Sequence, residues 1–122
     1  MSRAATRAAL ALLALLPLPA FAGFECKVDR QCGGGSCETY PGGPFVIEQT
    51  GDTWAITADG QSWQAFEAGF IDDTGELVLV MPPQGGMSGM ISIFPEGQFL
   101  FTAHAAGPVA ISGEGACVAT GG

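Results

Sequence analysis

Short runs in which apolar and polar side chains alternate follow one another from about position 23 onward. Because strand side chains point alternately to the two faces of a sheet, this pattern predicts β-strands. The expected strands cover residues 23–30, 45–49, 53–57, 62–66, 76–81, 90–94 and 98–104, and a last one runs from 109 toward Cys117. Turn residues recur every ~8–12 positions, and no useful helical period appears after Ala22. We therefore predict an all-β fold, a small antiparallel sandwich or partly closed barrel of about seven to eight strands, stapled by disulfides.

The clearest predicted element is a hairpin between Met90 and His104. Its strands are joined by Pro95-Glu96-Gly97, in which proline presets φ at the first corner and Gly97 takes the positive φ that closes the turn. One face of the second strand carries Phe99, Phe101 and Ala103. His104 lies on the other face and is expected to face solvent. Residues 82–89, with two prolines and three glycines, are predicted to be a loop.

Residues 1–22 have the pattern of an export signal. Arg3 and Arg7 precede the apolar run 8–16, and Ala20-Phe21-Ala22 fits a small-x-small cleavage site. The apolar run is shorter than the ~20 residues of a membrane-spanning helix. We therefore predict a cleaved signal peptide over 1–22 and a single β domain over 23–122. That domain is expected in the periplasm or secreted, without a membrane span.

The predicted mature chain is strongly acidic. It retains two basic residues, Lys27 and Arg30, and all twelve acidic residues, so its formal net charge is −10. Such a chain repels nucleic acids and anionic membrane surfaces. Its partner is unknown from sequence, although the charge favours a basic protein if the partner is a macromolecule.

Four cysteines stand at positions 26, 32, 37 and 117. An even number in an exported chain indicates two disulfides. Their spacing does not match the closely paired cysteines of a structural zinc site. Three glycines between Cys32 and Cys37 favour a small loop pinned by a disulfide. The competing arrangement, Cys32 with Cys117 and Cys26 with Cys37, stays open on these residues alone.

No coherent catalytic set is visible. His104 is the single histidine, and Ser88 lies in Gly86-Met87-Ser88-Gly89, which lacks one residue of the Gly-x-Ser-x-Gly elbow. The acidic residues offer no evident pair for glycoside cleavage. Asp72, Asp73 and Glu76 are more typical of an acidic turn than of a calcium loop. We therefore expect no enzyme and no cofactor.

Three methionines and the histidine suggest one metal hypothesis. Met81, Met87 and Met90 cluster around the predicted 82–89 loop, and His104 lies on the adjoining strand. Thioethers with imidazole suit Cu(I). The alternative, that these methionines fill irregular gaps in a core, is favoured, so no metal site is assigned.

Four aromatic residues have two interpretations. Trp54, Trp63, Phe66 and Phe70 could form a binding surface, but in a small β domain such residues more often form the core. We expect the core.

The overall plan, an exported β domain with a cysteine near each end, is similar to that of small periplasmic inhibitors of c-type lysozyme. The resemblance implies a β-barrel with a bridge between Cys26 and Cys117, which leaves Cys32 to pair with Cys37. It also implies a basic hydrolase as partner. The Gly-Ala-Arg-Tyr type of inhibitory loop is absent, and the only tyrosine, Tyr40, precedes a Pro-Gly turn, so no inhibitory residue is assigned.

These observations favour a non-enzymatic binding or structural protein of the periplasm. The first alternative is an inhibitor of a basic cell-wall hydrolase such as c-type lysozyme. The second is a copper-binding protein that uses Met81, Met87, Met90 and His104.

Overall fold

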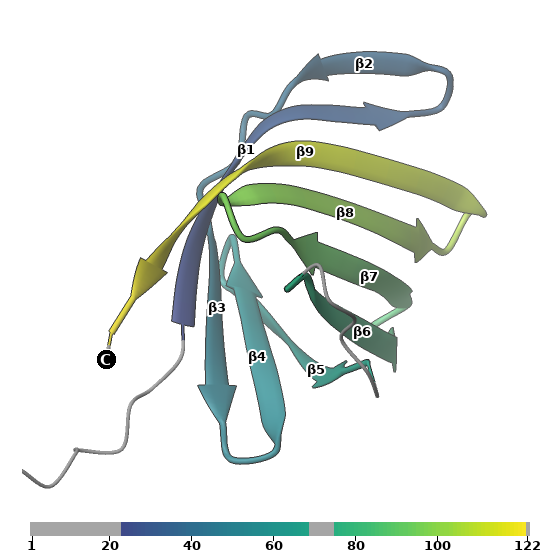
Figure 1. The fold of residues 1–122 in the computed structure, drawn as a ribbon. Coiled ribbons are helices and arrows are strands. Elements are labelled where there is room, and N and C mark those ends of the chain that lie inside the picture. The colour runs from purple at the N-terminus through teal and green to yellow at the C-terminus, as the bar shows by residue number, and fades with distance from the viewer. Residues whose placement is uncertain (1–22, 69–74, 122) are drawn as a thin grey trace, which may run out of the picture.

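The computed structural model describes residues 23–68 and 75–121, so the predicted signal segment 1–22 lies outside the described residues. The described residues form nine β-strands (Figure 1). Their bounds are β1 Gly23–Gly33, β2 Ser36–Thr39, β3 Phe45–Thr50, β4 Thr53–Ala58, β5 Gln61–Glu67, β6 Leu77–Gln84, β7 Met87–Ile93, β8 Gln98–Ala105 and β9 Val109–Thr120. These described ranges contain no apolar helix of membrane-spanning length.

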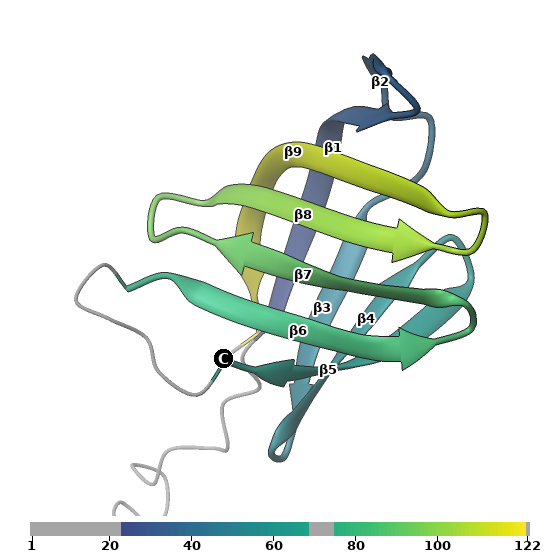
Figure 2. The same ribbon diagram turned by 90° about the vertical axis from the view of Figure 1, so that its right-hand side faces the viewer.

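The strands close into an antiparallel barrel. From β3 to β9 each strand pairs with the next along the chain, and β1 pairs with both β3 and β9, which joins the two ends of the sheet. Eight strands therefore form the barrel wall, and Figure 2 shows β6 to β9 in front of β3 and β4. The prediction of an all-β antiparallel fold is confirmed, and of the two architectures considered the protein adopts the barrel.

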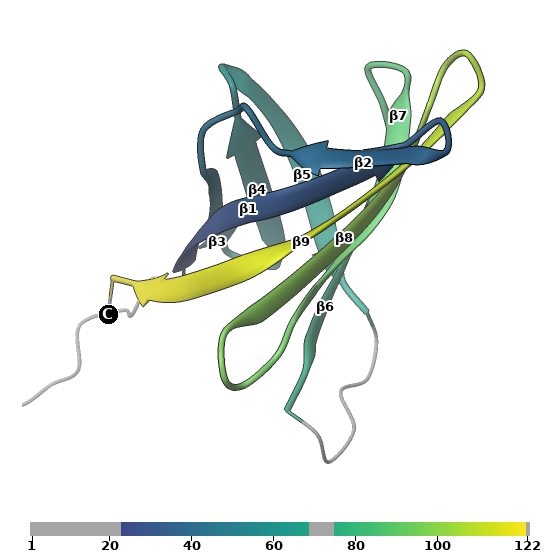
Figure 3. The same cartoon turned by 90° about the horizontal axis from the view of Figure 1, so that it is seen from above.

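The extra strand β2 pairs only with the second half of β1, outside the closed wall (Figure 3). The predicted small loop pinned by a disulfide between Cys32 and Cys37 is present, and it is the tip of this β1–β2 hairpin. Gly34 and Gly35 supply the turn with φ values of 60° and 85°. Glycine adopts such values without steric cost, so the glycine-rich run permits strand pairing on either side of the turn.

Both predicted disulfides are present. Cys26 of β1 and Cys117 of β9 are cross-strand partners, so their bridge staples the seam at which the barrel closes. Cys32 and Cys37 are likewise partners across the β1–β2 hairpin. The competing arrangement of the four cysteines is therefore excluded.

The predicted hairpin at Pro95-Glu96-Gly97 is confirmed. Gly97 has a φ of 97°, its N–H donates to the carbonyl of Phe94, and the N–H of Phe94 donates to the carbonyl of Gln98. The predicted loop over residues 82–89 is wrong, since only Gly85 and Gly86 separate β6 from β7. The two prolines lie where the β6–β7 register shifts, and at such a bulge a missing N–H costs little.

One end of the barrel is filled by large side chains. Trp54 is buried and stacks on Phe24 with ring centroids 6.4 Å apart. Around them the fully buried residues come from β1, β3, β4, β6, β7 and β8, and they include Cys26, Ile47, Ile56, Leu79, Ile91 and Phe99. The same strands continue from this packed half into the other half of the barrel, so the packing holds their positions there as well.

Candidate functional site: a cavity in the open end of the barrel

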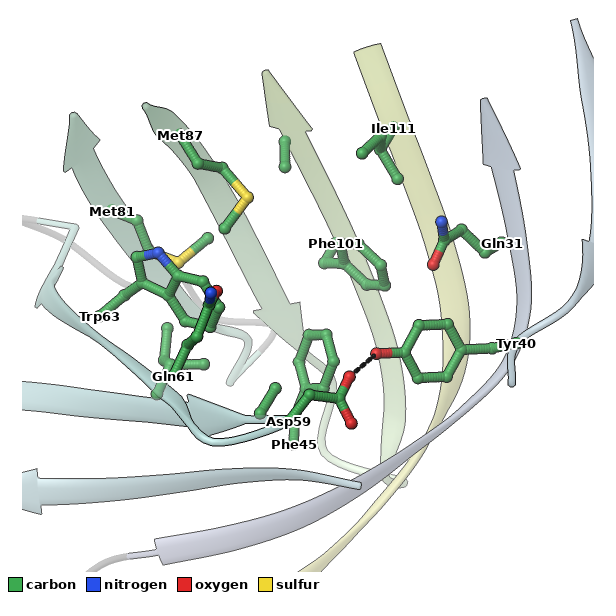
Figure 4. A pocket seen from close by; sticks show the side chains of 13 residues that line it. Gln31, Tyr40, Phe45, Asp59, Gln61, Trp63, Met81, Met87, Phe101 and Ile111 are labelled. Atoms are coloured by element: carbon green, nitrogen blue, oxygen red, sulfur yellow. Dashed lines mark hydrogen bonds between the residues drawn. The ribbon is translucent and has the colours of Figure 1, made fainter. Parts of the chain in front are cut away.

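The half of the barrel opposite this core contains a cavity of about 210 Å³. It lies where β4, β6 and β8 end and where β3, β5, β7 and β9 begin, and Figure 4 shows its walls. Its lining is mostly apolar and consists of Gln31, Tyr40, Phe45, Ile56, Ala58, Asp59, Gln61, Trp63, Met81, Met87, Phe101, Ala103 and Ile111. Eight-stranded barrels have room inside for packed side chains or for one small ligand.

The cavity exists because several inward positions at this level carry small residues. Ala58 and Ala103 are 6% and 3% exposed and extend only a methyl group into the interior. Gly113 lies under the ring of Phe101 so closely that a Cβ there would clash with it. The Phe101 ring can therefore lie against the β9 wall and leave the centre open.

The rim of the cavity is polar and is organised by Asp59. The hydroxyl of Tyr40 donates to Asp59 Oδ2 at 3.0 Å, and the backbone N–H of Gly43 donates to Asp59 Oδ1 at 3.2 Å. Asp59 itself adopts a φ of 50°, a left-handed conformation that aspartate tolerates better than most residues. One carboxylate in the β4–β5 turn thus holds the segment after β2 beside the cavity mouth.

This arrangement also perturbs the tyrosine. Partial burial raises the pKa of Tyr40 above its ordinary value of 10.0, and the hydrogen bond to Asp59 and the negative charge of Asp59 raise it further. Each of these effects favours the neutral phenol over the phenolate. The Tyr40 hydroxyl therefore remains a hydrogen-bond donor throughout the neutral range.

Of the neighbouring strands in the barrel wall, β5 and β6 share the fewest paired residues. Backbone partners there are limited to Phe66 with Val80 and Glu67 with Leu79, extended by one bond from Ala68 N–H to the Val78 carbonyl. Nearer the open end, the strands are bridged by a side chain instead.

That side chain is the carboxamide of Gln84. Its Oε1 accepts from the backbone N–H of Gln64 at 2.8 Å, and its Nε2 donates to the Gln64 carbonyl at 2.7 Å. The Nε2 group also donates to the carbonyl of Pro82 at 3.1 Å. The amide thus takes the place of a strand residue where the β6 bulge moves the backbone of β6 out of register.

The structure does not bring the four proposed copper ligands together. Met81 and Met87 line the barrel cavity. Met90 and His104 are exposed on the outer face, where they border a separate depression that Met81 also touches and Met87 does not. Strand alternation on β7 accounts for the separation, because Met87 and Met90 are an odd number of residues apart.

The prediction that His104 faces solvent is confirmed, since it is exposed on β8. Ser88 is its cross-strand partner on β7. Neither residue lines the barrel cavity. Glu76 precedes β6, whereas Asp72 and Asp73 of the predicted acidic turn lie outside the described residues. No cluster of three or more histidine, cysteine or carboxylate side chains suited to a metal occurs in the described ranges.

The four aromatic residues have different environments. Trp54 belongs to the core as expected, and Trp63 is half-buried, packs against that core and lines the cavity. Phe66 is 41% exposed on the outer face, so the expectation of a core position is wrong for it. Phe70 lies outside the described residues.

Sequence reasoning missed the cavity residues Tyr40 and Asp59, and also Gln84, which bridges β5 and β6, because all three lie in or next to segments that the sequence predicts as turns or loops. A usable signal was present in the inward positions of the strands. Near one end of the barrel some of these positions carry small residues, namely Ala58, Ala103 and Gly113, whereas near the other end most carry large ones such as Trp54, Ile47 and Phe99. Such a difference predicts a barrel that is packed at one end and hollow at the other.

Comparisons of the chain with models of known families, with curated proteins and with solved structures gave no match. The class of protein is therefore defined by its architecture, an up-and-down β-barrel with a disulfide at its closing seam and a cavity at one end.

Proposed function

We propose that this chain is an exported, non-enzymatic binding protein that holds a small apolar molecule in the open end of its barrel. The observation that carries the proposal is the cavity of about 210 Å³, whose walls are mostly aromatic, aliphatic and thioether side chains. Concave apolar sites with a few polar groups at one edge are typical of small-molecule binding. An apolar cavity of about 150 Å³ accommodates benzene, so the ligand is the size of one ring with a short substituent.

Two features support export. The two disulfides are compatible with an oxidising compartment outside the cytoplasm. Residues 1–22 have the charge, hydropathy and small-residue pattern of a signal peptide. An intact-mass measurement on the exported protein tests this part, because the expected product begins at Gly23.

Methyl NMR offers a direct test of binding. In the chain labelled with [methyl-¹³C]methionine, Met81 and Met87 report on the cavity, whereas Met90 is 45% exposed on the outer face and is an internal control. Titration with the neutral molecules indole and toluene should shift the Met81 and Met87 signals saturably and leave the Met90 signal in place. If neither molecule shifts the cavity methyls, the binding proposal is wrong.

A variant that fills the cavity tests where the ligand binds, and the same substitution at an exposed position is its matched control. Ala103→Leu adds three carbon atoms to the cavity wall and should weaken indole binding at least tenfold. Ala116→Leu adds the same atoms at an exposed position on β9 and should leave the affinity unchanged. Equal affinities in the two variants would place the ligand somewhere other than the cavity.

The lysozyme-inhibitor and copper hypotheses are tested independently of the cavity. Inhibition of added c-type lysozyme by the protein decides the first. Native mass spectrometry with Cu(I), carried out on the parent and on Met90→Leu, decides the second. An effect in either assay that survives Ala103→Leu would assign the function to the outer surface.

A further inference from the structure

We propose that the cavity selects compact apolar cations of the quaternary ammonium type, an inference that rests on the binding function proposed above. The cavity combines several aromatic rings with one carboxylate at the rim, and all of them face the same space (Figure 4). Each feature alone is ordinary in a small barrel. Their combination in one cavity defines the charge and the shape of the ligand.

The aromatic rings form a connected wall. Phe45 lies between Tyr40 and Phe101, with ring centroids 6.1 Å from the first and 5.2 Å from the second. Trp63 lines the cavity from β5. The face of an aromatic ring attracts a cation within about 6 Å of its centroid, and tryptophan does so most strongly. The thioethers of Met81 and Met87 add polarisable surface to the same space.

The only charged side chain among the described lining residues is Asp59. Its two hydrogen-bond donors, the Tyr40 hydroxyl and the Gly43 N–H, are uncharged and leave its negative charge in place. The predicted mature chain has two basic residues, Lys27 and Arg30, and neither lines the cavity. Arg30 instead forms an exposed ion pair with Glu114, in which Arg30 Nη1 lies 3.9 Å from Glu114 Oε1. The site therefore attracts a cationic ligand and repels an anionic one.

The position of the polar groups favours an alkylated ammonium over a primary amine. The polar lining residues Gln31, Tyr40, Asp59 and Gln61 lie near the ends of strands or in the segments at the rim. Trp63 adds an indole N–H, which can only donate. The deeper residues Ile56, Met81 and Ala103 bring no polar group into the interior apart from the weakly accepting thioether. A primary ammonium carries three N–H donors that would be left without partners there, which is costly in an apolar site. A quaternary ammonium has no N–H donor.

Three molecules of nearly equal size test this selectivity on the full chain. Choline carries a trimethylammonium group, 3,3-dimethylbutan-1-ol is its neutral carbon isostere, and 3,3-dimethylbutanoate is an anion of the same shape. Each is titrated into [methyl-¹³C]methionine-labelled protein at constant ionic strength, with Met81 and Met87 as reporters. We expect choline to bind at least fivefold more tightly than the alcohol, and the anion to bind most weakly.

Two carboxylate variants separate a local from a global effect of charge. Asp59→Asn removes the charge and keeps one acceptor oxygen for the Gly43 N–H, while its amide nitrogen can donate to the Tyr40 hydroxyl, which also accepts. This variant should reduce the preference for choline over the alcohol roughly fivefold. Asp52→Asn removes the same charge from the β3–β4 turn at the other end of the barrel and should leave the preference unchanged. Trp63→Leu keeps an apolar wall without a π face and should also reduce the preference.

The outcomes distinguish this inference from the binding function itself. If the alcohol binds as tightly as choline, the cation selectivity is wrong while the binding function stands. If choline is preferred but Asp59→Asn and Asp52→Asn behave alike, the assignment of Asp59 is wrong. If none of the three molecules moves the Met81 and Met87 signals, the inference is overturned, and the indole and toluene titrations decide the binding function separately.

Discussion

Gln84 should contribute to stability far more than an exposed glutamine ordinarily does. Its carboxamide makes two short hydrogen bonds to the backbone of Gln64, at 2.8 and 2.7 Å, on the seam where β5 and β6 have few backbone bonds of their own. Gln84→Leu removes both of these bonds, together with the longer one to the Pro82 carbonyl, and keeps a side chain of similar size. A hydrogen bond contributes about 0.5–1.5 kcal/mol net, so the two bonds to Gln64 alone correspond to a loss of about 1–3 kcal/mol of unfolding free energy, and the bond to Pro82 adds to it.

Urea denaturation at neutral pH measures the loss, with Gln98→Leu as the matched control. Gln98 is an exposed glutamine whose amide, among the described residues, makes one long side-chain bond, from Nε2 to Glu96 Oε2 at 3.4 Å, so this control should change the unfolding free energy by less than about 0.5 kcal/mol. Faster amide hydrogen exchange at Gln64 in Gln84→Leu would confirm where the effect arises. Equal stability of the two variants would refute the role of Gln84 in closing the barrel.

Gln84→Glu gives a second, pH-dependent test of the same bonds. An ionised carboxylate can still accept from the Gln64 N–H, but its other oxygen would face the Gln64 carbonyl, which needs a donor. Protonation restores a donor. The deficit relative to the parent should therefore be present near pH 7 and should shrink as the pH falls through about 4. A deficit that does not depend on pH would contradict the hydrogen-bond geometry.

Three further predictions concern the turn, the long disulfide and the tyrosine. Gly97→Val should cost at least about 1–3 kcal/mol, because φ is 97° and a Cβ would lie 2.8 Å from the Cys117 carbonyl oxygen, whereas Glu96→Val in the same turn should cost much less in thermal unfolding. Replacing both Cys26 and Cys117 by alanine opens a loop of 91 residues and should cost about 4–5 kcal/mol in urea, against about 2 for the Cys32 and Cys37 pair, whose separation is 5. Tyr40 is the single tyrosine, so the ultraviolet absorbance of phenolate should give its pKa directly, above 10.0. The folded state holds this proton more tightly than the unfolded state, so the contribution of Tyr40 to stability is complete below pH 10 and is lost as the pH rises through the raised pKa. Tyr40→Phe should abolish that alkaline loss.

Features that depend on a few neighbouring residues could be predicted from the sequence. The turn at Pro95-Glu96-Gly97 and the strands on either side of it were predicted because a hairpin of this kind depends on a few neighbouring residues. The error over residues 82–89 has the opposite cause. Prolines and glycines there indicate a loop by local preference, but the pairing of β6 with β7 overrides that preference once the sheet has formed.

The candidate site was the least predictable part. The proposed copper ligands Met81, Met87, Met90 and His104 are close in the sequence and in neighbouring strands, yet the alternation of the strands divides them between the inside and the outside of the wall. Asp59 and Tyr40 are nineteen positions apart and meet only because β2, β3 and β4 bring their ends to one rim. Sequence spacing alone contains neither fact.

The sequence by itself determined the strand class, the register of the main hairpin and the number of bridges, since alternation, turn residues and cysteine count act over short distances or are properties of composition. It also determined the net negative charge of the chain. Only the tertiary structure decided that β1 would meet β9 and close a barrel, and that one end of that barrel would remain hollow. The physical reason is that the size of a cavity depends on which inward side chains of the eight strands lie at the same level of the barrel. Those levels, like the closure of the wall, are set by the relative stagger of strands that are far apart in the chain.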